Sequence, residues 1–113
     1  MSYLESDEGG ALLRLVLYTT SKSQAEKVLE FTTPTQALTV SEVCKNLLEG
    51  NLPLNAEETK VLSQHKLILR YLANPGLSIT QRVQKVRYHH PVLTRILLLL
   101  KGHLLKVLKD LQQ

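Results

Sequence analysis

VRYHHPVLTRILLLL, residues 86–100, places two histidines and a proline directly before a run of leucines. Proline is tolerated at the first position of an α-helix and disrupts a helix that runs through it. Leucine is a strong helix former, whereas β-sheets favour β-branched and aromatic residues. The stretch therefore predicts a joint between two helices, near residues 79–89 and 91–111.

The composition of the whole chain agrees with a small helical domain. Its 113 residues suit one domain with a core of modest size. Hydrophobic residues make up 43% and charged residues 21%, a balance that is too apolar for a disordered chain. Tryptophan is absent and phenylalanine occurs once, so leucine must supply most of the core. We expect an all-α fold.

Three helix starts are predicted by capping pairs, in which an N-cap side chain is followed three residues later by a side chain that reaches back. The pairs are Thr39 with Glu42, Asn55 with Glu58, and Ser78 with Gln81. Gly50, residues 74–76 (NPG) and Pro91 predict helix ends. A further short helix, SKSQAEKVLEF at 21–31, should stop before Pro34. The sequence thus predicts a compact bundle of about five helices, near 21–31, 40–49, 56–73, 79–89 and 91–111.

The N-terminal residues divide into two parts. Residues 1–10, MSYLESDEGG, are acidic and end in two glycines, so we expect a flexible acidic leader. The apolar positions of residues 11–18 suit either a buried helix or a short strand, because periodicity does not separate the two over so few residues. Residues 11–113 are expected to form a single helical domain.

The last predicted helix is apolar over more than half of its circumference, because Leu98 and Leu105 lie outside its main leucine stripe. Such a helix is either central in a bundle or part of a dimer interface. We expect a homodimer through this helix, with the following interface residues: Leu97, Leu98, Leu104 and Leu105. A membrane span is excluded because Arg95, Lys101 and Lys106 interrupt every window of the required ~20 residues.

The sequence lacks the usual patterns of catalysis and metal binding. Cys44 is the single cysteine and falls on an apolar helix face, so it predicts a core residue in a reducing, intracellular setting, cytoplasm or nucleus. The four histidines have no zinc-binding spacing with one another or with Cys44. Neither a glycine-rich phosphate loop nor a nucleophile elbow is present. We therefore expect no catalytic residues, no metal site, no cofactor and no enzymatic activity.

Charge is the most informative global feature. Residues 1–58 hold four basic and nine acidic residues, a net charge of −5, while residues 59–113 hold ten basic residues and one acidic residue, a net charge of +9. A basic half of this kind predicts an anionic partner. The leading hypothesis is sequence-nonspecific association with nucleic acid, with RNA and DNA both open. The predicted contacts are Arg82, Lys85, Arg87, Arg95 and Lys106.

A protein-interaction module is the competing hypothesis. In this alternative the protein is an assembly adaptor that self-associates through its leucine-rich C-terminal helix and docks an acidic protein partner. The two hypotheses differ in salt dependence. Binding to phosphates weakens linearly on a log–log plot against salt, whereas a leucine-driven interface responds little.

Residues 46–86, NLLEGNLPLNAEETKVLSQHKLILRYLANPGLSITQRVQKV, resemble small uncharacterised helical proteins of Polinton/Maverick-type elements and adenovirus-like DNA viruses. The residues that carry the resemblance are Leu48, Gly50, Asn51, Pro53, Leu54, Leu62, His65, Lys66, Leu69, Arg70, Leu72, Ser78 and Arg82. The resemblance implies a virion- or genome-associated accessory role and supplies no catalytic residues. This chain departs from the family pattern after Arg82, where it has YHHP in place of a lysine-richer segment and a Gly-Gly pair.

Overall fold

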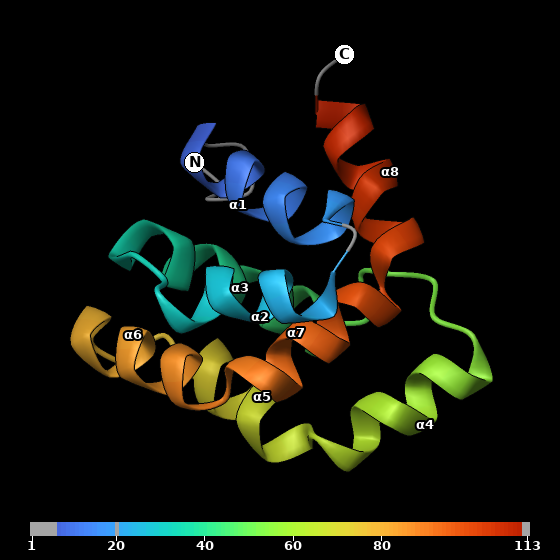
Figure 1. Ribbon diagram of the computed structural model, residues 1–113. Coiled ribbons are helices and arrows are strands. Elements are labelled where there is room, and N and C mark those ends of the chain that lie inside the picture. Colours follow the sequence, from blue (N-terminus) through green and yellow to red (C-terminus); the bar gives the residue numbers. More distant parts are fainter. Residues whose placement is uncertain (1–6, 20, 112–113) are drawn as a thin grey trace.

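The structure is a computed structural model that describes residues 7–19 and 21–111. These residues form eight α-helices and no strand, and the ribbon in Figure 1 shows them packed into one bundle. The helices are α1 (Asp7–Tyr18), α2 (Lys22–Glu30), α3 (Pro34–Leu48), α4 (Ala56–Gln64), α5 (Lys66–Ala73), α6 (Ile79–Tyr88), α7 (His90–Leu99) and α8 (Lys101–Leu111). The all-α prediction is confirmed, and the predicted number of about five helices is too low.

Two of the long predicted helices are broken. The expected helix at 56–73 consists of α4 and α5, which meet at His65, and the expected helix at 91–111 consists of α7 and α8, which meet at Leu100. His65 has a φ of −117° and Leu100 a φ of −93°, both outside the regular helix. Neither position is itself a glycine or proline, although Gly102 follows Leu100 by two residues. Each break changes the direction of the chain, so that the apolar residues before and after it contact different parts of the core.

Two of the three predicted helix starts are confirmed. Asn55 and Ser78 each form a complete capping box at the start of α4 and α6. The third prediction is wrong, because α3 begins at Pro34 with a capping box from Thr33 and Gln36. Thr39 is instead buried within α3, and its hydroxyl donates a hydrogen bond to the Thr35 carbonyl oxygen at 3.1 Å. Pro34 therefore starts a helix, as its fixed φ and missing N–H allow.

The N-terminal helix begins earlier than expected. Because α1 starts at Asp7, the last four residues of the predicted flexible leader are helical, and Gly9 and Gly10 are buried. The remainder of that leader, residues 1–6, lies outside the described residues. Residues 11–18 are helical rather than a strand, because Leu12, Leu13 and Val16 fall on one helix face that enters the core.

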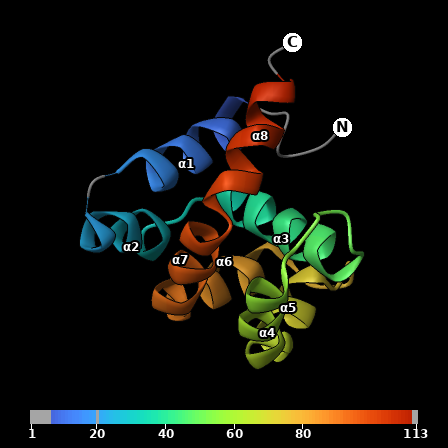
Figure 2. The ribbon, with the colours of Figure 1, turned by 90° about the vertical axis from the view of Figure 1, so that its right-hand side faces the viewer.

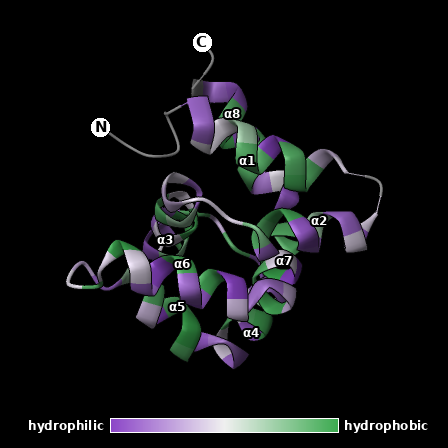
Figure 3. Ribbon diagram, turned by 60° about the vertical axis from the view of Figure 1, so that its left-hand side comes forward, coloured by the Kyte–Doolittle hydropathy of each residue, from purple (hydrophilic) through white to green (hydrophobic). Residues whose placement is uncertain are grey.

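All eight helices of the described residues contribute buried residues to the core, and the most extensive helix contacts are those of α3 with α5 and α6 and of α2 with α7. Buried leucines from α1 and α8 meet those of α7 in one continuous cluster. Figures 1 and 2 show α1 and α8 together at one end of the bundle and α4 and α5 at the other end, with α7 between them. In the hydropathy colours of Figure 3, hydrophobic and hydrophilic residues alternate along the helices, the pattern of helices with one buried and one exposed side. Over the described residues, no helix combines the length and apolar character needed to cross a membrane.

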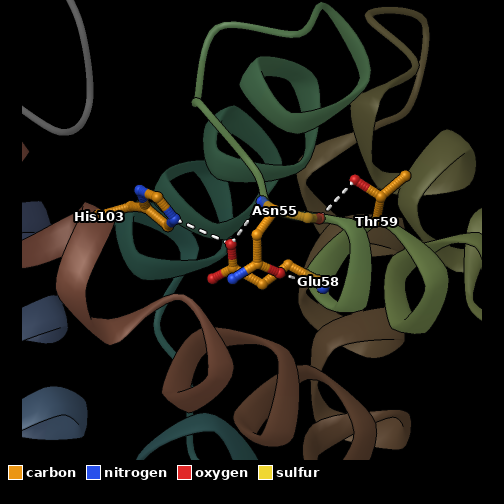
Figure 4. A network of polar contacts seen from close by, with 4 residues as sticks. All are labelled: Asn55, Glu58, Thr59 and His103. Carbon is orange, nitrogen blue, oxygen red and sulfur yellow. Dashed lines mark hydrogen bonds and ion pairs between the residues drawn. The ribbon is translucent and has the colours of Figure 1, made fainter.

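Helix α4 lies at the edge of the bundle and is tied to it by a polar contact. Its buried side chains are Leu62 and Glu58. The Asn55 backbone N–H donates to Glu58 Oε1 at 2.9 Å, and His103 Nε2 of α8 lies 3.1 Å from the same oxygen. Because a carboxylate only accepts hydrogen bonds, the imidazole is the donor in this contact. Figure 4 shows Glu58 placed between the α4 cap and α8.

Acid is expected to loosen α4 through Glu58. The Asn55 backbone hydrogen bond and, second, the His103 contact lower the pKa of Glu58 below its ordinary value. A carboxyl group whose pKa is lower in the folded state contributes stability above the unfolded pKa and loses it as the pH falls through the lowered folded value. Amide hydrogen exchange of α4 should therefore accelerate as the pH falls below about 4, after correction for intrinsic exchange rates.

The matched variant is Glu58→Gln, which keeps an N3 side chain able to accept from the cap but removes the titration. Its α4 protection should be weaker at neutral pH and should not change over the same acidic range. An equal acid response in both proteins would exclude Glu58 as the responsible group.

Candidate nucleic-acid interface

The first predicted contact residue, Arg82, is buried in the structure. Its Nη1 donates to Ser41 Oγ at 2.9 Å and to the Leu72 carbonyl oxygen at 2.7 Å, while Nη2 donates to the Asn74 carbonyl oxygen at 2.8 Å. The side chain thus ties α6 to α3 and to the C-terminal end of α5, where helix carbonyls have no intrahelical partner. With its guanidinium enclosed in the fold, Arg82 is a structural residue, and its prediction as a nucleic-acid contact is corrected.

The second predicted contact, Lys85, lines a groove between α5 and α6. This groove, called the α5–α6 groove below, has a volume of about 740 Å³. Its lining residues are Ser63, Gln64, His65, Lys66, Leu67, Ile68, Tyr71, Lys85, His89 and Val92. The two breaks at His65 and His89 bring the ends of α4 and α6 and the starts of α5 and α7 to the same hollow. The local backbone breaks therefore create this surface.

The described lining of the α5–α6 groove carries cations and no carboxylate. Lys85 Nζ lies 4.4 Å from the centroid of the Tyr71 ring, a cation–π contact that holds the ammonium over the aromatic face. Burial and, second, the charge of Lys85 lower the pKa of His89 below its ordinary value. His89 is therefore mostly neutral at pH 7, and Lys66 and Lys85 supply the permanent charge of the groove.

Further side chains extend this surface. Arg70 and Arg95 are exposed, and each lies one helical turn beyond a lining residue, Lys66 on α5 and Val92 on α7 respectively. The Tyr88 side chain is 79% exposed and makes an edge-to-face contact with His89, with ring centroids 4.8 Å apart. Sequence reasoning included Arg95 but missed Arg70 and Lys66. Lys66 and Arg70 are four residues apart on α5, and this spacing could have predicted that they lie on the same helix face.

The other two predicted contacts lie elsewhere. Arg87 is exposed, but its Nη2 donates to the Thr32 carbonyl oxygen at 2.9 Å and so bridges α6 to the α2–α3 turn. Lys106 lines a different hollow with Arg14 and Lys109, between α1 and α8. The five predicted contacts therefore do not form one stripe. Lys85 and Arg95 belong to the α5–α6 surface.

Within residues 7–19 and 21–111, direct ion pairing does not neutralise these cations. Among the described residues, the recorded carboxylate contacts of basic side chains are Lys45 with Glu49 at 4.0 Å and His103 with Glu58 at 3.1 Å. Neither pair involves a residue that lines the α5–α6 groove. In the part of the chain that the structure describes, the cations of the α5–α6 groove are therefore not ion-paired with a carboxylate.

The predicted interface leucines separate into two pairs. Leu97 and Leu104 are each 2% exposed and belong to the core of the single chain, so their prediction as interface residues is corrected. The physical reason is the break at Leu100, which lets α7 and α8 turn their leucines inward against different neighbours. Leu98 and Leu105 are half-buried and pack against the edge of the core.

Cys44 has the environment expected of a core residue. It is 2% exposed, and burial raises the pKa of its thiol to about 12. A thiol that stays protonated at neutral pH is a poor nucleophile and a poor metal ligand. Among the residues that the structure describes, no group of three or more histidine, cysteine, aspartate or glutamate side chains is arranged to hold a metal ion.

The α5–α6 groove therefore combines positive charge, exposed aromatic rings and a concave shape, which together suit an extended anionic ligand. Comparisons of the chain with protein-family models, with curated proteins and with solved structures give no match.

Proposed function

We propose that the protein binds nucleic acid without sequence specificity and uses the α5–α6 groove as its main contact surface. The observation that carries this proposal is the described groove lining, in which two lysines, two histidines and a tyrosine occur without a carboxylate. Lysine and arginine bind phosphates and release counterions, which supplies most of the affinity in nonspecific binding. The work of the protein is then binding and not turnover.

The aromatic side chains favour a single strand as the ligand. Tyr71 lies inside the groove and Tyr88 beside it, and both rings have exposed surface. Proteins that bind single strands combine a cationic groove with aromatic rings on which bases stack. In this arrangement Lys66, Lys85 and Arg95 contact phosphates while a base stacks on Tyr88. The proposal leaves both RNA and DNA as ligands.

An accessory role in a viral or mobile-element genome fits this proposal. The resemblance of residues 46–86 to Polinton/Maverick-type proteins covers α4, α5 and most of α6, the helices that build the groove. A small protein that coats or guides nucleic acid would need charge and stacking groups more than a catalytic centre.

The decisive experiment is fluorescence anisotropy with labelled single-stranded DNA, single-stranded RNA and duplexes, between about 50 and 300 mM salt. We expect binding to single strands with a linear log–log dependence on salt. The double variant Lys66→Glu with Lys85→Glu should weaken binding by at least about tenfold and reduce the salt slope by about two contacts.

The matched control is Lys22→Glu with Lys27→Glu, which makes the same charge change at two exposed lysines of α2. These residues do not line the α5–α6 groove. Equal losses in both double variants would show that net charge alone drives binding, and the groove would lose its assigned role. The absence of binding at low salt would refute the function itself.

A protein adaptor is the second candidate function. It is favoured by exposed apolar side chains on α1, where Leu15 is 56% and Tyr18 66% exposed. Exposed apolar side chains that gather on one surface are typical of protein contacts.

A further inference from the structure

A second surface lies on the outer side of α1, away from the α5–α6 groove. Two hollows meet there, one of about 490 Å³ against α8 and one of about 700 Å³ against α2. Arg14 and Tyr18 line both hollows, so the two lie next to each other on α1. We call this combined feature the α1 surface. Its other lining residues are Ala11, Leu15, Thr19, Gln24, Val28, Leu105, Lys106, Leu108 and Lys109.

The α1 surface has an apolar stripe that the core does not use. Leu12, Leu13, Val16 and Leu17 of α1 are buried. Ala11, Leu15 and Tyr18 lie at positions i, i+4 and i+7 and form a second stripe on the solvent side. A helix that is apolar on both sides is normally enclosed on both sides. The outward stripe therefore indicates that something covers it.

Three cations border this stripe. Arg14, Lys106 and Lys109 line the hollow between α1 and α8, and no carboxylate appears in the described lining of either hollow. Gly10 leaves room for the Arg14 guanidinium, because a Cβ on Gly10 would lie only 3.2 Å from its Nη1. The hollow against α8 is thus positively charged, while the hollow against α2 is mainly apolar.

We propose that the α1 surface docks an amphipathic helix from an acidic partner protein. Leucine-like side chains of that helix would fill the hollow beside Leu15 and Tyr18, and its carboxylates would face Arg14, Lys106 and Lys109. A helix that docks in a groove presents anchors spaced by three, four and seven residues. The apolar stripe on α1 has the same helical spacing, so the two helices can pack side by side. The protein would then join a nucleic acid on one surface to an acidic protein on another.

Charge and shape favour this partner over other anions. A nucleic-acid strand needs cations along its whole path, and the hollow against α2 is lined by one cation, Arg14, among the described residues. A lipid surface contacts a convex apolar face, whereas the α1 surface consists of two hollows. An acidic amphipathic helix has both an apolar side that can fill the hollows and carboxylates that can pair with the cations beside them.

The test uses a synthetic helical peptide of about 18 residues, with leucines at every third or fourth position and glutamates along one flank. A second peptide has lysines in place of the glutamates. We expect the glutamate peptide to bind with a Kd on the order of 10 μM and the lysine peptide to bind at least about tenfold more weakly. Amide chemical shifts should change in α1 and α8.

The variants separate this surface from the nucleic-acid groove. Leu15→Glu, and separately Lys106→Glu with Lys109→Glu, should each weaken peptide binding by about tenfold. Leu67→Glu is the matched control, because Leu67 is 83% exposed and lines the α5–α6 groove. It should leave peptide binding unchanged. Leu15→Glu should leave single-strand binding unchanged, so the two proposals can fail independently.

Four results would overturn the inference. They are equal binding of the two peptides, no binding of either peptide, shift changes confined to the α5–α6 groove, and loss of single-strand binding in Leu15→Glu. Vesicles of phosphatidylcholine and phosphatidylserine provide the lipid comparison. Binding to these vesicles without binding to the glutamate peptide would assign the α1 surface to a membrane.

Discussion

Replacing Arg82 with alanine is expected to lower the free energy of unfolding by about 3 kcal/mol. The side chain is 7% exposed and donates three hydrogen bonds, to Ser41 Oγ and to the carbonyl oxygens of Leu72 and Asn74. Its removal leaves the buried Ser41 hydroxyl and Leu72 carbonyl oxygens without this donor, and each unsatisfied buried group costs about 1–3 kcal/mol. Urea unfolding followed by circular dichroism measures the change.

Two further arginine substitutions make the experiment specific. Arg87→Ala removes an exposed side chain with one recorded hydrogen bond, to the Thr32 carbonyl oxygen, and should cost no more than about 1 kcal/mol. Arg82→Lys keeps the charge but loses the planar fork that reaches several acceptors, so its cost should lie between the two. If Arg82→Ala unfolded at the same urea concentration as Arg87→Ala, the structural role of Arg82 would be refuted.

The same variant separates folding from ligand binding. At a temperature where Arg82→Ala remains folded, its affinity for single strands should equal that of the original chain, because the guanidinium is enclosed between α3, α5 and α6. A loss of affinity in the folded variant would show that Arg82 contacts nucleic acid, as the sequence predicted.

Helix content and several boundaries could be predicted from sequence because they depend on local chemistry. Asn55 with Glu58 and Ser78 with Gln81 are reciprocal caps, and each satisfies backbone donors within four residues of chain. Thr39 with Glu42 has the same spacing but lies inside α3, because Thr33 and Pro34 provide an earlier start with a complete box. A capping motif therefore marks a possible helix start, but it does not show which of two possible starts the helix uses.

The breaks at His65 and Leu100 could not be predicted in this way. The segment 56–73 contains no glycine or proline, and Gly102 in the segment 91–111 lies two residues beyond Leu100, within α8. We attribute the breaks to the way the apolar stripes pack on the core. The break at His65 also helps to build the candidate site, since His65 lines the α5–α6 groove together with His89, which lies at the joint that Pro91 predicted. Sequence analysis found the basic half of the chain but not which cations would lie together, because that depends on tertiary packing.

Arg82 illustrates the same limit on one helix. From the spacing of its apolar residues alone, the buried face of α6 would consist of Ile79, Val83 and Val86. In the structure Ile79 is 51% exposed, while Arg82 and Val86 are buried, so the helix is rotated relative to the prediction. The carbonyl groups at the C-terminal end of α5 have no partner within the helix, and Arg82 donates hydrogen bonds to them from a neighbouring face of α6. Hydrogen bonding of these carbonyl groups therefore outweighed the burial of Ile79.

Replacing Leu97 with aspartate is expected to abolish folding. Leu97 is 2% exposed in the last turn of α7, and the substitution both leaves a cavity and introduces a buried carboxyl without a partner. The combined cost is roughly 4–6 kcal/mol, which approaches the whole stability of a domain of this size. Circular dichroism at 25 °C and loss of a cooperative thermal transition provide the measurement.

Leu105→Asp is the informative counterpart, because Leu105 is half-buried on α8 and lines the hollow against α1. It should keep the helical spectrum and lower the free energy of unfolding by about 1–2 kcal/mol. Sedimentation of both variants then tests the proposed homodimer. If the original chain is a dimer and Leu105→Asp a folded monomer, the exposed edge of the α8 leucines forms the interface. If Leu97→Asp itself remains folded and merely loses its partner, Leu97 belongs to an interface and its placement in the core of the single chain is wrong.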